Sequence, residues 1–502
     1  MATETELKFR IPPARLAALR RAVATAGAEL QPLAAAYFDT PGEHLAQARM
    51  ALRLRREGAA WVQTLKAEGA GTLQRLEHNV QLPEPLPGSV RPALDIARHD
   101  GTAAGTALRR LLADAGQPPL QERYATTVQR IRRLLRSGGA VIELALDIGE
   151  VRAGARSLPL CEIEFELLSG PPQALLALAG RWAARHGLLL DVRSKSELGH
   201  TLAAGLPGSP PAMARPLRLA RSASLDAART AMLANALRQV LANAGQMAAG
   251  PSDAGHLHQL RVGLRRLRSV LGAGWPAADG GVAAAAQEAL ATLFQQLGAA
   301  RDADAMGSWL WPALQAAGAP ALRLPLVAAT AADPAAPLRS PATQQLWLGL
   351  IGLGLPAGAV ALRAQAAPAK PQAAGAVLAG PLQKLWRQVR RDARRFQSLD
   401  DAARHRLRRR IKRLRYLTEL SAGLWPAKAV ARLLKRLKPA QERLGEFNDT
   451  VVALAHCRAL ADSDPQAWFA VGWLSARHAA LLPVCAAALQ HLAGARRPWP
   501  GR

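Results

Sequence analysis

Seven short runs between residues 35 and 168 alternate charged or polar residues with apolar ones, and this alternation constrains the fold more than any other feature of the chain. The runs are AAYFDT, MALRLRRE, AWVQTLKAE, RLEHNVQLP, TTVQRIRRLL, AVIELALDIGE and LCEIEFELL. Runs of this length with a period of two, separated by turn residues, are typical of consecutive antiparallel strands. Because alternate side chains of a strand share one face, each run gathers its charged residues on one side. The pattern predicts an antiparallel sheet or barrel with a charged interior.

The N-terminal segment TETELKFR has the same pattern. Glu4, Glu6 and Lys8 would project from one face of a strand, while Leu7 and Phe9 face an apolar layer. One interpretation is a set of exposed salt bridges across neighbouring strands, which contribute little to stability. The other is a polar cavity that holds a divalent cation and an anionic ligand. The cavity is favoured by the later runs, whose shared faces carry Arg53 with Arg55, Thr64 with Lys66, Arg75 with Glu77, Glu143 with Asp147, and Glu162 with Glu164 and Glu166.

Three motifs in these strands resemble the CYTH family, also called triphosphate tunnel metalloenzymes. They are ExExK on the first strand, RxR on a middle strand and ExE on a late strand, and the similarity covers about residues 1–203, including the late segment SKSELG. The resemblance implies an eight-stranded antiparallel tunnel that binds a triphosphate together with Mg²⁺ or Mn²⁺. It implies a metal held by Glu4, Glu6, Glu162 and Glu164, and phosphate bound by Lys8, Arg53, Arg55, Lys66, Arg130 and Lys195. For Arg130 the alternatives are Arg132 and Arg133, of which strand parity separates only Arg133.

Both kinds of side chain suit the chemistry of a triphosphate. Arg and Lys neutralise the charge of the phosphates and of the transition state, and carboxylates place a hard cation that bridges phosphoryl oxygens. The predicted catalytic residues are Arg53, Arg55, Lys66, Glu77 and Asp147. Glu77, Glu143 and Asp147 are second-choice ligands for a second metal or for orienting water. Many members of the family carry a second acid after Glu77, whereas this chain has Asn79.

The formal net charge of +28 predicts a polyanionic partner, and nucleic acid, an anionic membrane and polyphosphate all qualify. Cys161, Cys457 and Cys485 lie far apart without CxxC spacing, so neither a disulfide framework nor a zinc site is predicted. The N-terminus lacks a basic start followed by an apolar run. Residues 340–362 are uncharged, but their glycines and prolines favour a buried helix and turn over a membrane span. We expect a cytoplasmic protein, and association with polyphosphate granules is a further hypothesis.

A linker and a duplication organise the second half. The segment GLPGSPPAMARP is rich in Pro and Gly, and it predicts domains over residues 1–203 and 217–498 with a linker over 204–216. Beyond it, HQLRVGLRRLRS from His258 matches HRLRRRIKRLRY from His405, and LGAARDAD from Leu297 matches LGEFNDTV from Leu444. The separation is 39 residues in both copies, since 297 − 258 equals 444 − 405. We therefore predict a duplicated helical unit with repeats over about residues 217–340 and 375–498.

Each copy places a histidine and several cations at helical spacing on one face. The two faces comprise His258, Arg261, Arg265 and Arg268, and His405, Arg408, Lys412 and Arg415. A bound polyanion would relieve the repulsion within each face, whereas the alternative is a solvated face balanced by acids such as Asp302, Asp304 and Asp449. The segments His-x-x-Arg-x-x-x-Arg, RDxD and LGEFND resemble the CHAD domain over about residues 217–498. That resemblance implies two similar helical bundles around a basic cavity or surface that binds inorganic polyphosphate through these residues.

These patterns predict an α+β multidomain protein, with an N-terminal β tunnel and a C-terminal all-α duplicated bundle. The predicted function is metal-dependent hydrolysis of inorganic triphosphate in the tunnel, with polyphosphate bound by the helical half. One alternative is a class IV adenylate cyclase, for which Trp61 and Tyr37 are the candidates to stack a base. Another is a polyphosphate-binding protein without catalysis. A nucleic-acid partner is not expected, because aromatic residues are not interleaved with the basic runs, and no membrane partner is expected.

Overall fold

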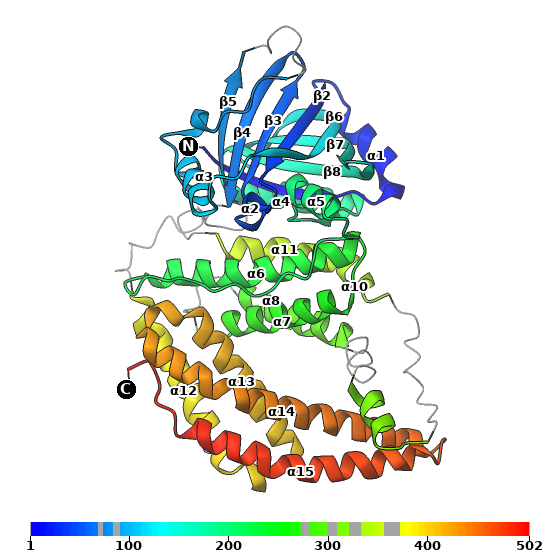
Figure 1. Cartoon of the computed structure of the whole chain (residues 1–502), viewed down its shortest axis with the longest axis vertical. Coiled ribbons are helices and arrows are strands. Elements are labelled where there is room, and N and C mark those ends of the chain that lie inside the picture. The colour runs from blue at the N-terminus through cyan, green and yellow to red at the C-terminus, as the bar shows by residue number, and fades with distance from the viewer. Residues whose placement is uncertain are drawn as a thin grey trace. The chain divides into compact units, whose positions relative to one another are not determined.

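The computed structural model describes residues 2–68, 74–83, 91–273, 275, 281–298, 309–320, 333–355 and 372–500, without the side chains of residues 2–4, 68 and 74–75 (Figure 1). The chain divides into two compact units. The first comprises Met1–Met213, Leu237–Leu260 and Leu338–Gln365, and the second comprises Ala214–Ala236, Arg261–Pro337 and Ala366–Arg502. Two helical segments from the second half of the sequence therefore belong to the unit that contains the sheet.

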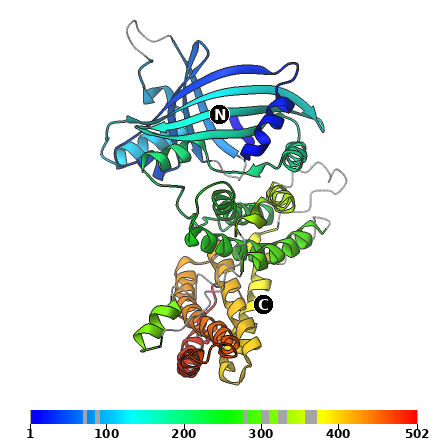
Figure 2. The same ribbon diagram turned by 90° about the vertical axis from the view of Figure 1, so that its right-hand side faces the viewer.

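The sheet of the first unit closes on itself. Its eight long strands are β1 Ala2–Arg10, β2 Glu29–Asp39, β3 Ala51–Glu57, β4 Ala60–Glu68, β5 Gln74–Leu82, β6 Gln121–Ser137, β7 Ala140–Ala153 and β8 Arg156–Ser169. They are ordered β5-β4-β3-β2-β6-β7-β8-β1, and β1 also pairs with β5. A ninth strand, β9 Leu189–Leu190, adds two residues beside β1. Figure 2 shows the strands curving around a common interior. The predicted eight-stranded antiparallel tunnel is thus confirmed.

The alternation in the sequence separates the two faces of the tunnel wall. On β7, Ile142, Leu144 and Leu146 are fully buried on one face, and Glu143 and Asp147 lie on the other. The apolar face is covered by α4 Pro172–His186, which packs on β1, β6, β7 and β8. The shorter elements are η1 Pro13–Arg15, α1 Leu16–Val23, α2 His44–Gln47, η2 Ile96–His99 and α3 Ala103–Asp114. The wall therefore keeps apolar side chains outside and charged side chains inside.

One short helix brings a lysine to the tunnel. Helix α5, Lys195–Ala203, begins with a capping box in which Ser194 and Glu197 each bond the other's backbone N–H. This cap sets the direction of the first helical residue, Lys195. Helix α5 packs against β6, β7 and β8.

The uncharged stretch of residues 340–362 begins with a buried helix. Helix α11, Pro341–Leu353, buries Trp347, Leu348 and Ile351 and packs on α4. The side chain of Gln344 accepts a hydrogen bond of 2.8 Å from the backbone of Leu190. The prediction of a buried helix and turn is confirmed through residue 355, and residues 356–371 lie outside the described residues.

The other helices lie mostly in the second unit. The first repeat contributes α6 Leu225–Ala249, α7 Ala254–Leu271, α8 Val282–Gln296, a helix over 309–316 and α10 Ala336–Arg339; α6 and α7 are each divided between the units. The second contributes α12 Ala374–Arg394, η5 Phe396–Ser398, α13 Asp401–Leu420, η6 Ala422–Leu424, α14 Ala427–Ala461 and α15 Ala467–Ala493. Helix α12 packs on α13 and α15, and α14 packs on α13 and α15, which makes a four-helix bundle. Among the described residues, α15 alone is long and apolar enough to span a membrane, and it buries Leu474, Leu481 and Leu489 in this bundle.

Candidate functional site

Strand register brings the charged residues of β1, β7 and β8 together inside the tunnel. Glu162 on β8 pairs with Asp147 on β7, and Glu164 pairs with Lys8 on β1. Two residues further along β8, Glu166 pairs with both Glu6 and Glu143. Since strands in register place these residues side by side, the acids form two neighbouring groups.

The first group consists of Asp147, Glu162 and Glu164, whose carboxylate oxygens lie within 4.8 Å of one another. The ammonium of Lys195 contacts all three, at 2.8 Å from Asp147, 2.5 Å from Glu162 and 2.8 Å from Glu164. Lys8 Nζ lies 3.1 Å from Glu162 Oε2. Arg130 donates two hydrogen bonds of 2.7 Å to Asp147 and one of 2.7 Å to Glu164.

These contacts lower the pKa of two acids of the first group, Asp147 and Glu164. Burial opposes the charge of Glu164, but Lys195, Arg130 and Lys8 outweigh it and hold the pKa of Glu164 well below its usual range. Burial likewise opposes the charge of Lys195, and Asp147, Glu162 and Glu164 nevertheless raise its pKa well above the ordinary value. Acids and bases in this group therefore neutralise each other.

The second group consists of Glu6, Glu143 and Glu166, and here acids outnumber bases. Burial raises the pKa of Glu166 to about 7, with repulsion from Glu143 and Glu6 adding to the effect. Lys66, which counteracts this shift, is itself paired with Glu77 at 2.6 Å. Glu166 is not among the ligands predicted from the sequence. The sequence does contain a signal for its position, because Glu166 follows Glu164 of the ExE motif by two residues and so lies on the same face of the strand.

Both groups offer the hard oxygen donors that Mg²⁺ and Mn²⁺ prefer. Within the described residues, Asp147, Glu162 and Glu164 are the acids whose oxygens lie close enough together to contact one ion. Burial and repulsion from Glu143 and Glu6 raise the pKa of Glu166, and a nearby divalent cation would oppose that shift. Glu162 and Glu164 also have suitable oxygens, but they contact Lys8, Lys195 and Arg130 instead. The backbone of Glu4 pairs with Arg75, and its predicted role as a ligand falls on a side chain outside the described ones.

Two arginines on β3 supply the anion-binding side of the tunnel. Arg53 donates a hydrogen bond of 3.2 Å to the hydroxyl of Tyr37, and Arg55 forms an ion pair with Glu57. In the described part of the chain, the Nε groups of Arg53 and Arg55 are buried without a hydrogen-bond acceptor. Burial and repulsion from Arg53 lower the pKa of Arg55 to about 10. Phosphate oxygens would satisfy these donors and relieve the repulsion.

The structure distinguishes among the three arginines of QRIRRLL. Arg130 contacts the first acid group, as described above. Arg132 is 43% exposed and contacts Glu29 at 2.8 Å and Glu143 of the second group at 3.7 Å, and the guanidinium of Arg133 lies over the ring of Trp182. Arg130 is less exposed than Arg132, at 17%, and it contacts the first acid group.

In the second unit, four predicted residues from the two repeats come together as a basic cluster: Arg261 and Arg265 on α7, and Arg408 and Lys412 on α13. Burial lowers the pKa of Lys412 to about 6, and repulsion from Arg408, Arg265 and Arg261 adds to the shift. One acid, Asp449, counteracts it and lies 3.7 Å from Arg408. The Nε of Arg265 is buried without an acceptor in the described residues. We call these four cations the Lys412 cluster.

Of the other predicted residues of the basic faces, His405 and Arg415 have partners close by in the chain or on a neighbouring helix. His405 Nδ1 lies 2.8 Å from the side-chain oxygen of Asn448, and Arg415 pairs with Glu419 one turn along α13 at 2.7 Å. Burial and repulsion from Arg409 lower the pKa of Arg268. His258 is half-buried on the part of α7 that belongs to the first unit. Asp302 and Asp304 lie outside the described residues.

Comparisons with known proteins agree with this geometry. The family model described as CYTH domain matches residues 2–197, and the model described as CHAD domain matches residues 231–458. A curated inorganic triphosphatase from Haemophilus influenzae is 30% identical over 171 residues, which cover 33% of this chain and 44% of that protein. This chain thus matches less than half of the length of that relative.

Solved structures also match, and two of them are described here. The CHAD domain from the plant Ricinus communis is 32% identical, with a TM-score of 0.48, and covers 59% of this chain and 100% of its own. A protein from Hippeastrum, described as a putative adenylyl cyclase that reveals a dominant triphosphatase activity, is 17% identical with a TM-score of 0.28, over 40% of this chain and 96% of its own. From the two family models, this chain contains a CYTH domain followed by a CHAD domain.

Proposed function

We propose that the tunnel hydrolyses the terminal phosphoanhydride bond of inorganic triphosphate and that the Lys412 cluster binds inorganic polyphosphate. One observation carries the enzymatic part: within the described residues, the interior of the closed sheet holds the Nε donors of Arg53 and Arg55 without an acceptor, together with Glu166, whose pKa burial and two neighbouring glutamates raise to about 7. The CYTH match and the triphosphatase relative support the reaction type. The substrate, the metal and the cytoplasmic location remain part of the proposal.

In this proposal, the basic residues bind phosphate or hold the acids in place, and the acidic residues bind the metal. Arg53 and Arg55 donate to the terminal oxygens of the substrate, and Arg gives planar bidentate contacts that hold a phosphoryl group in line. Lys8, Lys66 and Lys195 supply further positive charge, and Arg130 keeps Asp147 and Glu164 in place. A bound Mg²⁺ or Mn²⁺ would supply Lewis acidity and charge neutralisation at Glu6, Glu143 and Glu166, with Glu4, Glu162 and Glu164 as the further proposed ligands.

Most of the rate enhancement would come from positioning and electrostatics, since phosphoryl transfer needs little covalent help from a protein. Glu77 and Asp147 are the proposed residues that orient the attacking water. Both already contact a cation, Lys66 and Arg130 respectively, so their carboxylates are held in one orientation. Buried fixed charges of this kind act on the transition state without reorganising.

The polyphosphate part rests on the Lys412 cluster. A buried lysine whose pKa falls to about 6 among arginines marks a place where positive charge exceeds its compensation. A chain of phosphates supplies the missing negative charge and accepts hydrogen bonds from each guanidinium.

The structure weakens the sequence argument for a cyclase. The ring of Tyr37 stacks on Tyr124 at 4.8 Å and is buried, so it offers no open face to a base. Trp61 lies on β4 at the opposite parity from Thr64 and Lys66, which places it away from the charged interior. Neither of the two candidates is therefore placed to stack a nucleobase.

The test is phosphate release from tripolyphosphate, ATP and long-chain polyphosphate in Mg²⁺ or Mn²⁺. Wild type, Glu6→Gln and Glu166→Gln are compared with Glu150→Gln, which removes an acid from an exposed pair with Arg152 on the same sheet. We expect tripolyphosphate to be cleaved fastest, Glu6→Gln and Glu166→Gln to lose on the order of 100-fold in kcat, and Glu150→Gln to retain wild-type activity. Formation of cyclic AMP from ATP would support the cyclase instead. Absence of turnover would leave a binding protein.

A further inference from the structure

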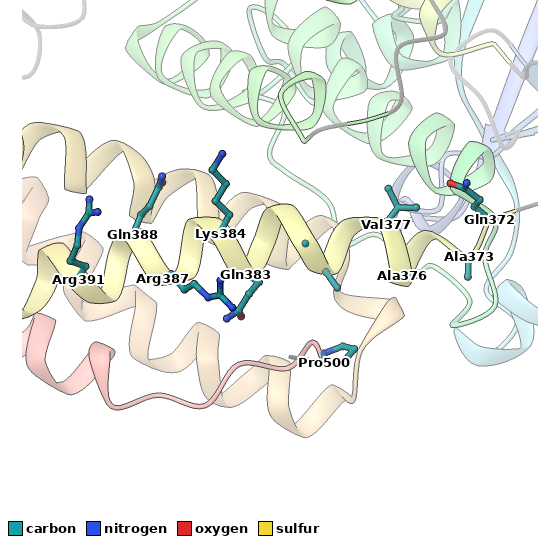
Figure 3. A pocket seen from close by; sticks show the side chains of 12 residues that line it. Gln372, Ala373, Ala376, Val377, Gln383, Lys384, Arg387, Gln388, Arg391 and Pro500 are labelled. Atoms are coloured by element: carbon teal, nitrogen blue, oxygen red, sulfur yellow. The ribbon is translucent and has the colours of Figure 1, made fainter. Parts of the chain in front are cut away.

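A groove follows the exposed side of α12, on the second repeat. Its larger part has a volume of about 920 Å³ and runs from Gln372 to Arg391, with Pro500 on its border (Figure 3). A smaller hollow of about 360 Å³ continues to Arg395. The two hollows share Gln383, Arg387 and Arg391, so they form one continuous groove.

The second half of this groove is strongly cationic. Residues 384–395 contain six Lys or Arg and a single acid, Asp392. That acid is buried and already contacts Arg391 at 3.1 Å and the guanidinium of Arg410. Five of the six cations are exposed, namely Lys384, Arg387, Arg391, Arg394 and Arg395. With a helical rise of 1.5 Å per residue, they cover about 16 Å of the helix. Figure 3 shows Lys384, Gln388 and Arg391 on one side of α12 and Arg387 with Gln383 on the other.

Because the helical half is duplicated, this face of α12 can be compared with the corresponding face of α6 in the first repeat. Helix α6 opens the first repeat as α12 opens the second, and the two share the tripeptide Arg-Gln-Val, at residues 238–240 and 387–389. The tripeptides are 149 residues apart, whereas the matched motifs of the two copies are 147 residues apart, since 405 − 258 and 444 − 297 are both 147. With the offset of 147, Arg394 and Arg395 correspond to Met247 and Ala248, and both of these are buried in the first unit. This face is therefore buried on α6 in the first repeat, whereas on α12 in the second repeat it is exposed and cationic.

We propose that the α12 groove from Gln383 to Arg395 is a second binding site for polyphosphate, distinct from the Lys412 cluster, which makes long chains bind more tightly than short ones. This inference rests on the proposed function. An elongated row of guanidinium and amide donors suits a flexible chain of phosphates. RNA is less suited, because Trp386, the aromatic residue that borders the groove, is only 2% exposed and offers no platform for a base. A chain that reaches both sites gains avidity, because the second contact becomes intramolecular.

The test compares the affinity of the whole protein chain for short and for long polyphosphate. The affinity is calculated per phosphate, because a long polyphosphate offers more positions at which a single site can bind. Wild type is measured beside the triple variant R387E/R391E/R394E. A matched variant, R432E/K435E/K438E, makes the same change of charge at exposed positions of α14. We expect wild type and the matched variant to prefer the long chain by on the order of 100-fold. The α12 variant should lose this preference while its short-chain affinity changes less than about twofold. Thermal unfolding checks that each variant is folded.

The possible failures are distinguishable. If neither chain binds wild type, the proposed polyphosphate function is wrong and this inference fails with it. If both chains bind but the length preference survives in the α12 variant, only the inference is wrong. The inference is also overturned if the α12 variant keeps the preference and instead loses affinity for single-stranded RNA or for poly-glutamate. In that case the groove serves a different partner.

Discussion

The tunnel and the Lys412 cluster both collect cations, but they differ in how the positive charge is compensated. In the tunnel, Lys195 contacts three carboxylates, and its pKa is raised well above the ordinary value. In the cluster, Lys412 faces Arg408, Arg265 and Arg261, and burial together with this repulsion lowers its pKa to about 6. The same side chain is thus stabilised as a cation in one place and destabilised in the other.

The difference indicates two arrangements of charge that a polyanion could bind. In the tunnel the cations are already paired with carboxylates, so a bound triphosphate would have to replace carboxylates that stay nearby and could then bind a metal. In the cluster the cations repel one another, and the proposed polyphosphate ligand would relieve this repulsion. The first arrangement suits a reaction, because acids and bases must both be in place when phosphate is transferred. The second suits reversible binding, because the ligand itself provides the missing charge.

Removing one charge from each site should affect stability in opposite directions. Asp147→Asn leaves only Glu162 and Glu164 to compensate Lys8, Lys195 and Arg130, so one buried positive charge becomes uncompensated and the unfolding free energy should fall by about 3–5 kcal/mol. Lys412→Met removes a side chain that is charged in the unfolded chain but must lose its proton on burial in the folded one, so it should raise the unfolding free energy near pH 7 by about 1 kcal/mol or more. Calorimetry on both variants, with Glu150→Gln as the exposed control on β7, measures the effects. A loss of stability in Lys412→Met would show that the cluster is compensated after all.

The affinity for polyphosphate should depend on pH through Lys412. Without ligand, Lys412 is mostly neutral above its pKa of about 6, whereas a bound polyanion favours the ammonium form. Binding then takes up a proton, so affinity should fall by up to about tenfold per pH unit as pH rises above 6, and should be flat below 6. Titrations at several pH values measure this slope. Lys412→Arg stays charged and should remove it, so a slope that persists in that variant would assign the proton to another group.

In the tunnel, Lys195→Met should increase the affinity for Mn²⁺ in the absence of triphosphate. The ammonium competes for Asp147, Glu162 and Glu164, whose oxygens are close enough together to contact one cation. We expect a gain of about tenfold, equivalent to 1.4 kcal/mol, measured from free Mn²⁺ by electron paramagnetic resonance. Arg55→Met is the control, because it removes a tunnel cation that forms an ion pair with Glu57 and not with the first acid group. An unchanged affinity would place the metal with Glu6, Glu143 and Glu166 instead.

The strand faces could be predicted from the sequence, because alternation alone decides which residues share a side. The grouping of Glu166 with Glu6 and Glu143 could not, since it depends on the register between strands that are far apart in sequence. The contacts of Lys195 with three carboxylates could not be predicted either, because they depend on where helix α5 packs against the strands.

The helical half shows the same limit. Spacing placed Lys412 and Arg415 on one basic face, but Arg415 pairs with Glu419 on its own helix, while Lys412 meets arginines of the other repeat. A helical pattern identifies a face and not what packs against it. The duplication, by contrast, was visible because motif and spacing recur together.

The smallest effect should come from a cation that belongs to neither site. Arg110 on α3 is 84% exposed and lies 3.8 Å from Asp114, one turn along the helix. Arg110→Ala removes one of the charges that make up the net +28, yet it should change the unfolding free energy by about 0.5 kcal/mol or less, because exposed pairs contribute little. Its effect on polyphosphate affinity at physiological salt should be equally small, since charges beyond about 8 Å are screened. If Arg110→Ala weakened binding as much as Lys412→Met, total charge would explain affinity and the contrast between the two sites would lose its meaning. A small effect would show that the position of each cation, and the acids around it, decide what the positive charge of this chain does.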